Sequence, residues 1–255
     1  MSSVSGISNV SYFDYGSFAS GKKINSAADG AAELSIIEKE DTQTRGLNVG
    51  ANNIQSAKDM LNVSDAALGS ISDYLQRIRE LAVQASNTAT VSDSDRANMQ
   101  KEVDQLKQGI TDVAQNTSFN TKPLLDGSNP AFNIATDSNG NYITVNGANA
   151  TLDALGITDF DLTGDFNIDD IDKAIDSVSS QRSSAGAKSN ALEYAYNYNT
   201  SAALYSTGAK SRLEDLDIPE AISEKKKQET LQEYALFARK KQEEEEQHKI
   251  NVLFA

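Results

Sequence analysis

The sequence predicts a mainly α protein, in which helices from the two ends of the chain pair into a long coiled-coil-like rod with a small β-hairpin insert in the middle. An apolar residue recurs every seventh position from Leu47 to Asn87. A second regular helical period runs from Ile168 to Leu213, and the period vanishes between the two stretches. The 255 residues include three prolines, which suits long helices because proline breaks a helix interior.

The first heptad stretch predicts one long helix that buries a narrow apolar stripe against other helices. From Leu47 to Ala85 such a helix is roughly 58 Å long at ~1.5 Å per residue, too long for a compact domain. Gly46, Gly50 and Gly69 each cost about 1 kcal/mol relative to alanine in a helix interior. We expect them to mark either the close approach of another helix or a bend. The seam residues assigned to this helix are Leu47, Ile54, Leu61, Leu68, Ile71, Leu75 and Ile78.

Two further helices are candidates to cover that stripe. One is predicted over residues 95–116, after a connector in which Ser92 and Ser94 are candidate caps. Its short link to the first helix predicts an antiparallel pair. The other steps by three and four residues from Ile168 to Leu213. Small and polar residues enter its seam after Leu192. Such residues help to fix the register of paired helices but add little stability. The seam residues assigned to these two helices are Val103, Leu106, Ile110, Ile171, Ile175, Val178 and Leu192.

The middle of the chain reads as β structure. Between residues 117 and about 162 the helical period is absent, and Asn139-Gly140 lies between two β-prone runs. This dipeptide in that setting is a strong hairpin signal. The side chains expected on the buried side of the hairpin are Phe132, Ile134, Ile143 and Val145.

The two ends of the chain carry weaker signals. Residues 1 to about 20 lack a helical period, which predicts a flexible end or, alternatively, a segment that becomes ordered against a partner. A last helix is predicted from Pro219, a residue well suited to a first helical turn, to about His248.

Charge and composition exclude several classes of partner. The formal net charge is −14, from 37 acidic and 23 basic residues, which argues against nucleic acid and against anionic membranes. No apolar run approaches the ~20 residues that span a bilayer. The chain has no cysteine, which excludes disulfides and cysteine-based zinc sites. The N-terminal residues lack the basic and apolar regions of a secretion signal.

Little in the sequence supports catalysis or a cofactor. His248 is the one histidine, it lies in a charged helix, and we expect it at the surface. No metalloprotease, phosphate-binding or nucleophile-elbow motif occurs, so we expect a protein that is not an enzyme. Residues 159–170 have the spacing of oxygen ligands in a calcium loop, but Asp170 replaces the usual glutamate and the entering helix is missing. An acidic turn that caps the next helix is the favoured interpretation, and a calcium site is the alternative.

Six segments closely resemble bacterial flagellin: SGKKINSAADGAAELSI at 20–36, QTRGL at 43–47, LQRIRELAVQASN at 75–87, FNTKPLLDG at 119–127, AIDSVSSQRSSAGAKSNALE at 174–193 and SRLEDLDIPEAI at 211–222. The resemblance covers about two thirds of the chain and implies a rod of paired terminal helices. It divides the chain into an N-terminal segment and joint (1–28), the N-terminal part of the rod (29–130), a short variable insert (131–163), the C-terminal part of the rod (164–217) and a C-terminal inner-core helix and tail (218–255).

The resemblance also implies a function. Copies of the chain would be exported unfolded through the flagellum's own secretion channel and would polymerise with one another into the extracellular flagellar filament. An export chaperone would bind the C-terminal helix. Two departures from the family pattern are the 19 residues before Ser20 and the charged ending KKQEEEEQHKINVLFA. Two alternatives stay open, the first because it shares flagellin-like ends and the second because of the short stretch before Ser20. These are a hook–filament junction protein and a secreted helical receptor-binding protein that does not polymerise.

One surface site follows from the resemblance. Arg77, Leu81 and Gln84 match the flagellin motif read by the vertebrate Toll-like flagellin receptor, and Glu102 matches its acidic companion. The first three recur at i, i+4 and i+7, so we expect them to share a helix face that points away from the seam. An arginine there is the residue type expected at an interface hot spot. The alternative is a solvated face that serves subunit packing.

Overall fold

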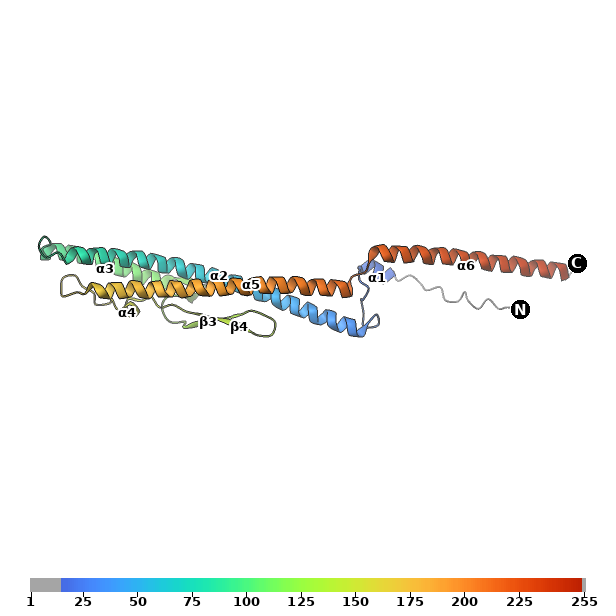
Figure 1. Cartoon of the computed structure of the whole chain (residues 1–255), viewed down its shortest axis with the longest axis horizontal. Helices are drawn as coiled ribbons and strands as arrows, with labels where there is room; N and C mark the ends of the chain where they lie inside the picture. Colours follow the sequence, from blue (N-terminus) through green and yellow to red (C-terminus); the bar gives the residue numbers. More distant parts are fainter. Residues whose placement is uncertain (1–14, 254–255) are drawn as a thin grey trace. The chain divides into compact units, whose positions relative to one another are not determined.

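The computed structural model describes residues 15–253, and the prediction of a mainly α protein is confirmed (Figure 1). The described residues form the helices α1 (Tyr15–Ser20), α2 (Ala31–Ala85), α3 (Asp93–Asn116), α4 (Leu152–Leu155), α5 (Ile168–Glu214) and α6 (Ile218–Leu253). They also form two antiparallel two-stranded sheets, β1 (Ser118–Phe119) with β2 (Lys122–Pro123) and β3 (Ala131–Ala135) with β4 (Tyr142–Asn146).

The chain divides into two compact units. Among the described residues, the first unit contains 15–41 and 205–253, and the second contains 42–204. Helices α2 and α5 each run from one unit into the other.

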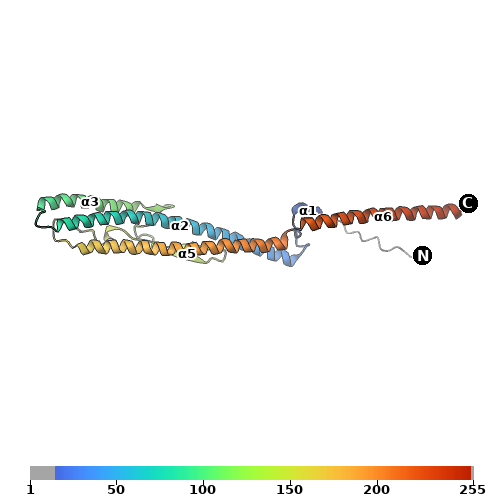
Figure 2. The same ribbon diagram turned by 45° about the horizontal axis from the view of Figure 1, so that its top comes forward.

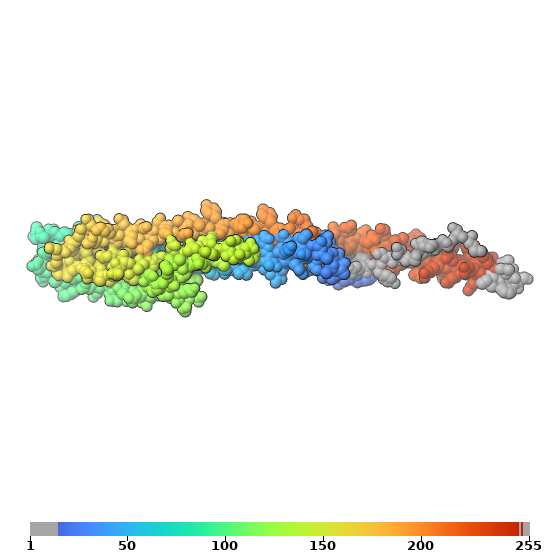
Figure 3. All heavy atoms as spheres, turned by 90° about the horizontal axis from the view of Figure 1, so that it is seen from below, coloured from blue at the N-terminus to red at the C-terminus, as the bar shows by residue number. Residues whose placement is uncertain are grey.

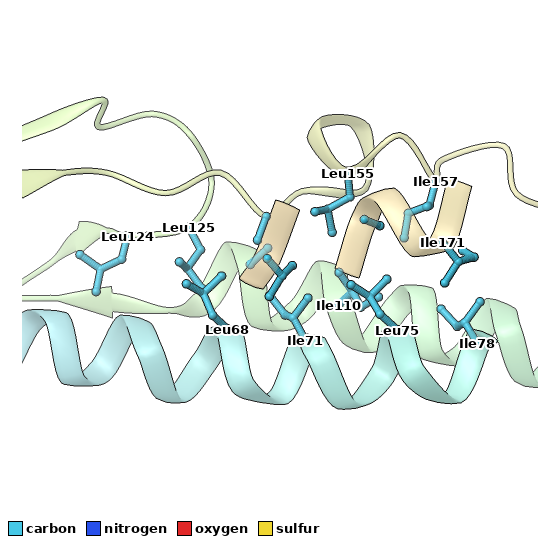
Figure 4. Packing of buried hydrophobic residues seen from close by; sticks show 14 of the residues in the cluster. Leu68, Ile71, Leu75, Ile78, Ile110, Leu124, Leu125, Leu155, Ile157 and Ile171 are labelled. Atoms are coloured by element: carbon cyan, nitrogen blue, oxygen red, sulfur yellow. The ribbon is translucent and has the colours of Figure 1, made fainter. Parts of the chain in front are cut away.

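In the second unit α2, α3 and α5 lie side by side and share one hydrophobic core (Figures 1 and 2). The residues assigned to the seam are buried, except Leu106 and Ile175, which are half-buried and pack against the same cluster. Figure 4 shows Leu68, Ile71 and Leu75 of α2 pointing toward the elements packed over them. The long α2 is therefore held by what covers it rather than by helix propensity alone.

Ser92 starts α3. Its hydroxyl accepts a hydrogen bond from the backbone N–H of Asp95 at 3.3 Å, and the Asp95 carboxylate accepts one from the Ser92 N–H at 3.0 Å. This reciprocal capping box satisfies two backbone donors at once, and it confirms Ser92 as a cap. The helix begins at Asp93, two residues before the predicted start.

The predicted hairpin is formed by β3 and β4, which the space-filling view shows lying along one face of the second unit (Figure 3). The register pairs Phe132 with Val145 and Ile134 with Ile143. Val145 is buried, and the other three side chains are half-buried against the core. Asn139-Gly140 lies in the loop that joins the strands, with a positive φ of 82° at Gly140.

Gly46 and Gly50 let the tip of this hairpin pack directly on the backbone of α2. A Cβ on Gly50 would lie 1.8 Å from the carbonyl oxygen of Thr136, and one on Gly46 would lie 2.1 Å from the Cβ of Ser138. The side-chain amide of Asn199, on α5, donates to the same Thr136 oxygen at 2.6 Å. The two glycines therefore mark a close approach, in which the nearest backbone is that of the hairpin loop and the Asn199 side chain of α5 lies beside it at Gly50.

In the first unit, the residues before α2 pair with the end of α5. The Lys23 N–H donates to the Glu214 carbonyl at 2.8 Å, and the Leu216 N–H donates to the Gly21 carbonyl at 2.9 Å. The expectation of an irregular segment up to about residue 20 is wrong for residues 15–20, which form α1. Six residues are too few to show a helical period in the sequence. The rest of that segment, 1–14, lies outside the described residues.

The close approach at Gly50 predicts opposite effects for two glycine-to-alanine changes. Gly50→Ala should destabilise the fold by about 1–3 kcal/mol, because its methyl group displaces the hairpin tip. Gly186→Ala, at a position on α5 with nothing within 4 Å of the new atom, should stabilise the fold by about 0.5–1 kcal/mol. Urea unfolding followed by circular dichroism measures both changes, and a stabilising Gly50→Ala would contradict the packing.

Candidate interaction surfaces

Arg77 links α2 to α3 on an exposed face. Its Nε donates to Glu102 Oε1 at 2.7 Å, and its Nη1 donates to Glu80 Oε2 at 2.9 Å. The hydrogen bond with Glu102, and after it the bond with Glu80, raises the pKa of the Arg77 guanidinium above its ordinary value. The side chains of Arg77 and Glu102 are 48 % and 42 % exposed, so both stay within reach of a partner.

The other two residues of the predicted receptor site, Leu81 and Gln84, differ in exposure. Gln84 is exposed, but Leu81 is only 3 % exposed and belongs to the core. The expected outward orientation is therefore wrong for Leu81. The reason is that α2 is packed by more than one helix, so the buried stripe is wider than a two-helix seam. Met60 occupies the equivalent heptad position and is also buried.

Within the second unit, three charged pairs join α2 to α5 along the edges of the seam. They are Arg79 with Asp172 at 2.5 Å, Arg182 with Asp65 at 2.8 Å, and Lys58 with Glu193. The Arg182 pair is bidentate, with a second contact at 3.3 Å. Exposed pairs of this kind contribute little to stability individually, but a fork-shaped pair between two helices fixes their relative register.

These pairs also shift the titration of their carboxylates. The Arg79 hydrogen bond lowers the pKa of Asp172 below its ordinary 3.8, and the Lys58 hydrogen bond lowers the pKa of Glu193 below its ordinary 4.5. The charged forms are therefore favoured in the folded protein.

The acidic segment 159–170 uses its oxygens within the fold. The Asp161 carboxylate accepts from both the N–H and the hydroxyl of Thr163, each at 2.7 Å. The Asn167 side chain accepts from the Asp169 N–H at 3.0 Å, in the first turn of α5. Among residues 15–253 no group of three or more acidic or histidine side chains is arranged to hold a metal ion. The geometry is that of turns leading into a helix.

Helix α6 presents large apolar side chains to solvent. Its side chains are mostly exposed where the structure describes them, and His248 is among the exposed ones. The large apolar members are Ile222, Leu231, Tyr234, Leu236 and Phe237, each at least 40 % exposed. In the same unit, Lys225 Nζ lies 5.5 Å from the centre of the Tyr15 ring. These exposed side chains make α6 a candidate for contact with a partner.

Long helices that pack side by side and are joined by charged pairs define a protein built from helix–helix packing. In the described part of the chain, no helix combines the length and apolarity needed to cross a membrane. The buried residues of the described seam are almost all apolar.

Comparisons with known proteins agree with that class. The bacterial flagellin N-terminal helical region matches residues 17–130, and the bacterial flagellin C-terminal helical region matches residues 168–253. The chain is 34 % identical over 244 residues to a flagellin of Bacillus subtilis (strain 168), covering 81 % of this chain and 80 % of that one. It is 33 % identical over 239 residues to the flagellar filament 33 kDa core protein of Treponema phagedenis, covering 84 % and 82 %.

A solved structure is similar as well. The crystal structure of Bacillus cereus flagellin superposes with a TM-score of 0.51 at 31 % identity, over 58 % of this chain and 88 % of that one. The chain belongs to the bacterial flagellin family, and the resemblance read from the sequence is confirmed. It is a structural subunit of the extracellular flagellar filament, the organelle of motility.

The lowered carboxylate pKa values predict acid sensitivity. A folded-state pKa below the unfolded value contributes stability that is present above the unfolded pKa and lost as pH falls through the folded one. The unfolding temperature should therefore fall between about pH 5 and pH 3. Asp172→Asn should lower the unfolding temperature at neutral pH and make that fall shallower.

A matched control is Asp104→Asn, whose carboxylate accepts a hydrogen bond from Gln100 of the same helix. Differential scanning calorimetry across the pH series compares the two variants. Equal pH profiles for the wild type and Asp172→Asn would refute the role of the Arg79 pair.

Proposed function

We propose that copies of this chain are exported unfolded through the flagellar secretion channel and polymerise through their helices into the filament. The observation that carries the proposal is the apolar surface of α6. Leu231, Tyr234 and Phe237 are 51 %, 69 % and 62 % exposed on a helix of 36 residues. Helices in proteins gain most of their stability from packing. The exposed apolar side chains of α6 would therefore pack against helices of neighbouring copies.

Export fits the same helix. Exposed apolar side chains on α6 would promote aggregation before assembly, and an export chaperone bound to 218–255 would shield them. A chain without cysteine also cannot form wrong disulfides while it is unfolded. Chaperone and filament would then use one surface in succession, the first inside the cell and the second outside.

Substitutions on α6 test polymerisation. Leu231→Glu with Phe237→Glu should raise the concentration at which filaments form by about tenfold or more, because buried contacts become charged. The matched control is Gln232→Glu with Gln242→Glu, which adds the same charge at exposed polar positions. Sedimentation and electron microscopy of seeded, concentrated protein give the readout.

Assembly of the wild-type protein distinguishes a filament subunit from a protein that does not polymerise. Wild-type protein that stays monomeric at every concentration would favour the receptor-binding protein that does not polymerise. Equal effects of the two double substitutions would show that α6 responds to charge alone. The motif SGKKINSAADGAAELSI at 20–36 favours the filament subunit over a hook–filament junction protein, which shares flagellin-like ends.

We also propose that the vertebrate Toll-like flagellin receptor reads the α2–α3 face around Arg77. The support is that Arg77, Glu102 and Gln84 are accessible on neighbouring helices. Leu81 would act from beneath, by holding this part of α2 in the core. The same face could instead serve contacts between subunits, which is the alternative that binding data separate.

Two arginines of matched exposure provide the test. Arg77→Ala should weaken receptor binding by at least about tenfold with helix content unchanged, as for an interface hot spot. Arg79→Ala removes a side chain that is equally exposed, at 47 %, but is paired with α5, and should leave binding unaltered. Surface plasmon resonance measures both. Identical affinities for Arg77→Ala and the wild type would remove the receptor proposal.

Leu81→Ala is expected to behave differently from Arg77→Ala. Truncating a buried leucine costs about 2–5 kcal/mol of folding stability. Its effect should therefore appear first in thermal unfolding. A variant with wild-type stability and lost binding would place Leu81 in the receptor contact itself.

A further inference from the structure

One stretch of α5 in the second unit carries no charge. From Tyr194 to Leu204 the sequence YAYNYNTSAAL contains no acidic or basic residue, although such residues make up 24 % of the chain. Glu193, which pairs with Lys58, ends the charged part of the helix on one side. A neutral stretch of this length is notable on a chain with a net charge of −14.

Two tyrosines stand outward on this stretch. Tyr194 and Tyr198 are 78 % and 70 % exposed, and their spacing of four residues places them on one helix face. Leu192 and Asn199 point the other way and are 0 % and 3 % exposed. The inward face of the helix is therefore buried in the core, and the face with the two tyrosines is exposed to solvent.

The helix cannot simply rotate to bury these rings. Asn199 donates to the Thr136 carbonyl at 2.6 Å and to the Leu47 carbonyl at 3.5 Å, so it ties α5 to both the hairpin tip and α2. Turning the tyrosines inward would break these bonds and leave buried polar groups unpaired, which is costly. Their exposure is thus built into the fold of the second unit.

We propose that Tyr194 and Tyr198 contact a neighbouring copy of this chain in the filament, an inference that rests on the proposed polymerisation. Copies that each carry −14 repel one another, so their contacts favour surfaces without charge. Tyrosine is enriched and acidic and basic residues are depleted at the centre of protein interfaces. A tyrosine ring also offers a large rigid apolar area with a hydroxyl that can form a hydrogen bond at its edge.

The absence of charge on residues 194–204 favours a second copy of this chain over a basic partner at this surface. A basic partner would favour an acidic surface, and this chain offers many acidic side chains elsewhere, but α5 excludes them between 194 and 204. A partner with the same net charge as this chain is the one that gains most from a neutral contact.

The test compares one substitution at three positions of the full-length chain. Tyr194→Glu and Tyr198→Glu, made separately, should each raise the concentration needed for filament formation by about tenfold. The matched control is Tyr142→Glu, on β4 of the same unit, where the tyrosine is 63 % exposed. The control should change assembly by less than about twofold. Circular dichroism checks that helix content is retained in all three.

The outcomes separate this inference from the proposed function. Wild-type filaments together with normal assembly of both α5 variants overturn the tyrosine contact and leave polymerisation standing. An equal loss in the Tyr142→Glu control overturns it too, since any added charge would then suffice. Wild-type protein that forms no filaments overturns both proposals.

A second measurement needs no substitution. Hydroxyl-radical footprinting by mass spectrometry compares tyrosine oxidation in wild-type monomer and filament. Tyr194 and Tyr198 should lose most of their reactivity on assembly, and unchanged oxidation of both would overturn the contact even if a glutamate variant failed to fold.

Discussion

The fold of the second unit depends on burying one face of α2. Its seam residues recur every seven positions, and no single partner covers them all, because α3, α5 and the β segments each take part in one continuous core. Close packing of Leu68, Ile71 and Leu75 against these elements ties distant parts of the chain to a single helix (Figure 4). Apolar burial of this kind has no preferred direction, so other interactions must set the register of the helices.

Polar side chains on α5 supply that register. Arg182 lies between the buried seam residues Val178 and Leu192, and its two bonds to Asp65 fit one alignment of the helices. Farther along, Asn199 reaches the backbone of both α2 and the hairpin tip, which can approach because Gly50 has no side chain. A helix of small and polar seam residues gives up some hydrophobic free energy and gains a defined alignment. Subunits of a regular polymer need that alignment, since every copy must present the same surface.

Periodicity in the sequence predicted most of this architecture, because a heptad directly encodes which face is buried. The departures have local causes. Leu81 was expected outside because it shares the i, i+4 and i+7 spacing with Arg77 and Gln84, whereas packing by several elements also buries this position beside the seam. The β1–β2 turn lies at Asn120 and Thr121, with φ of 48° and 65°, and threonine gives no turn signal of the kind that Asn139-Gly140 gives. The role of Gly50 could not be read from the sequence either, since its partner Thr136 lies far along the chain.

The distribution of charge links the folded subunit to assembly. Around Arg77 the helices carry paired charges within reach of a partner, whereas Tyr194 and Tyr198 lie on a stretch without charge. Paired charges at an exposed face keep much of their hydration and suit contacts that form and dissociate. Neutral aromatic surface loses water at little electrostatic cost and suits contacts that persist. If both faces serve partners, the lasting contacts between subunits belong on α5, and the contacts of a folded subunit with other proteins belong on the α2–α3 side.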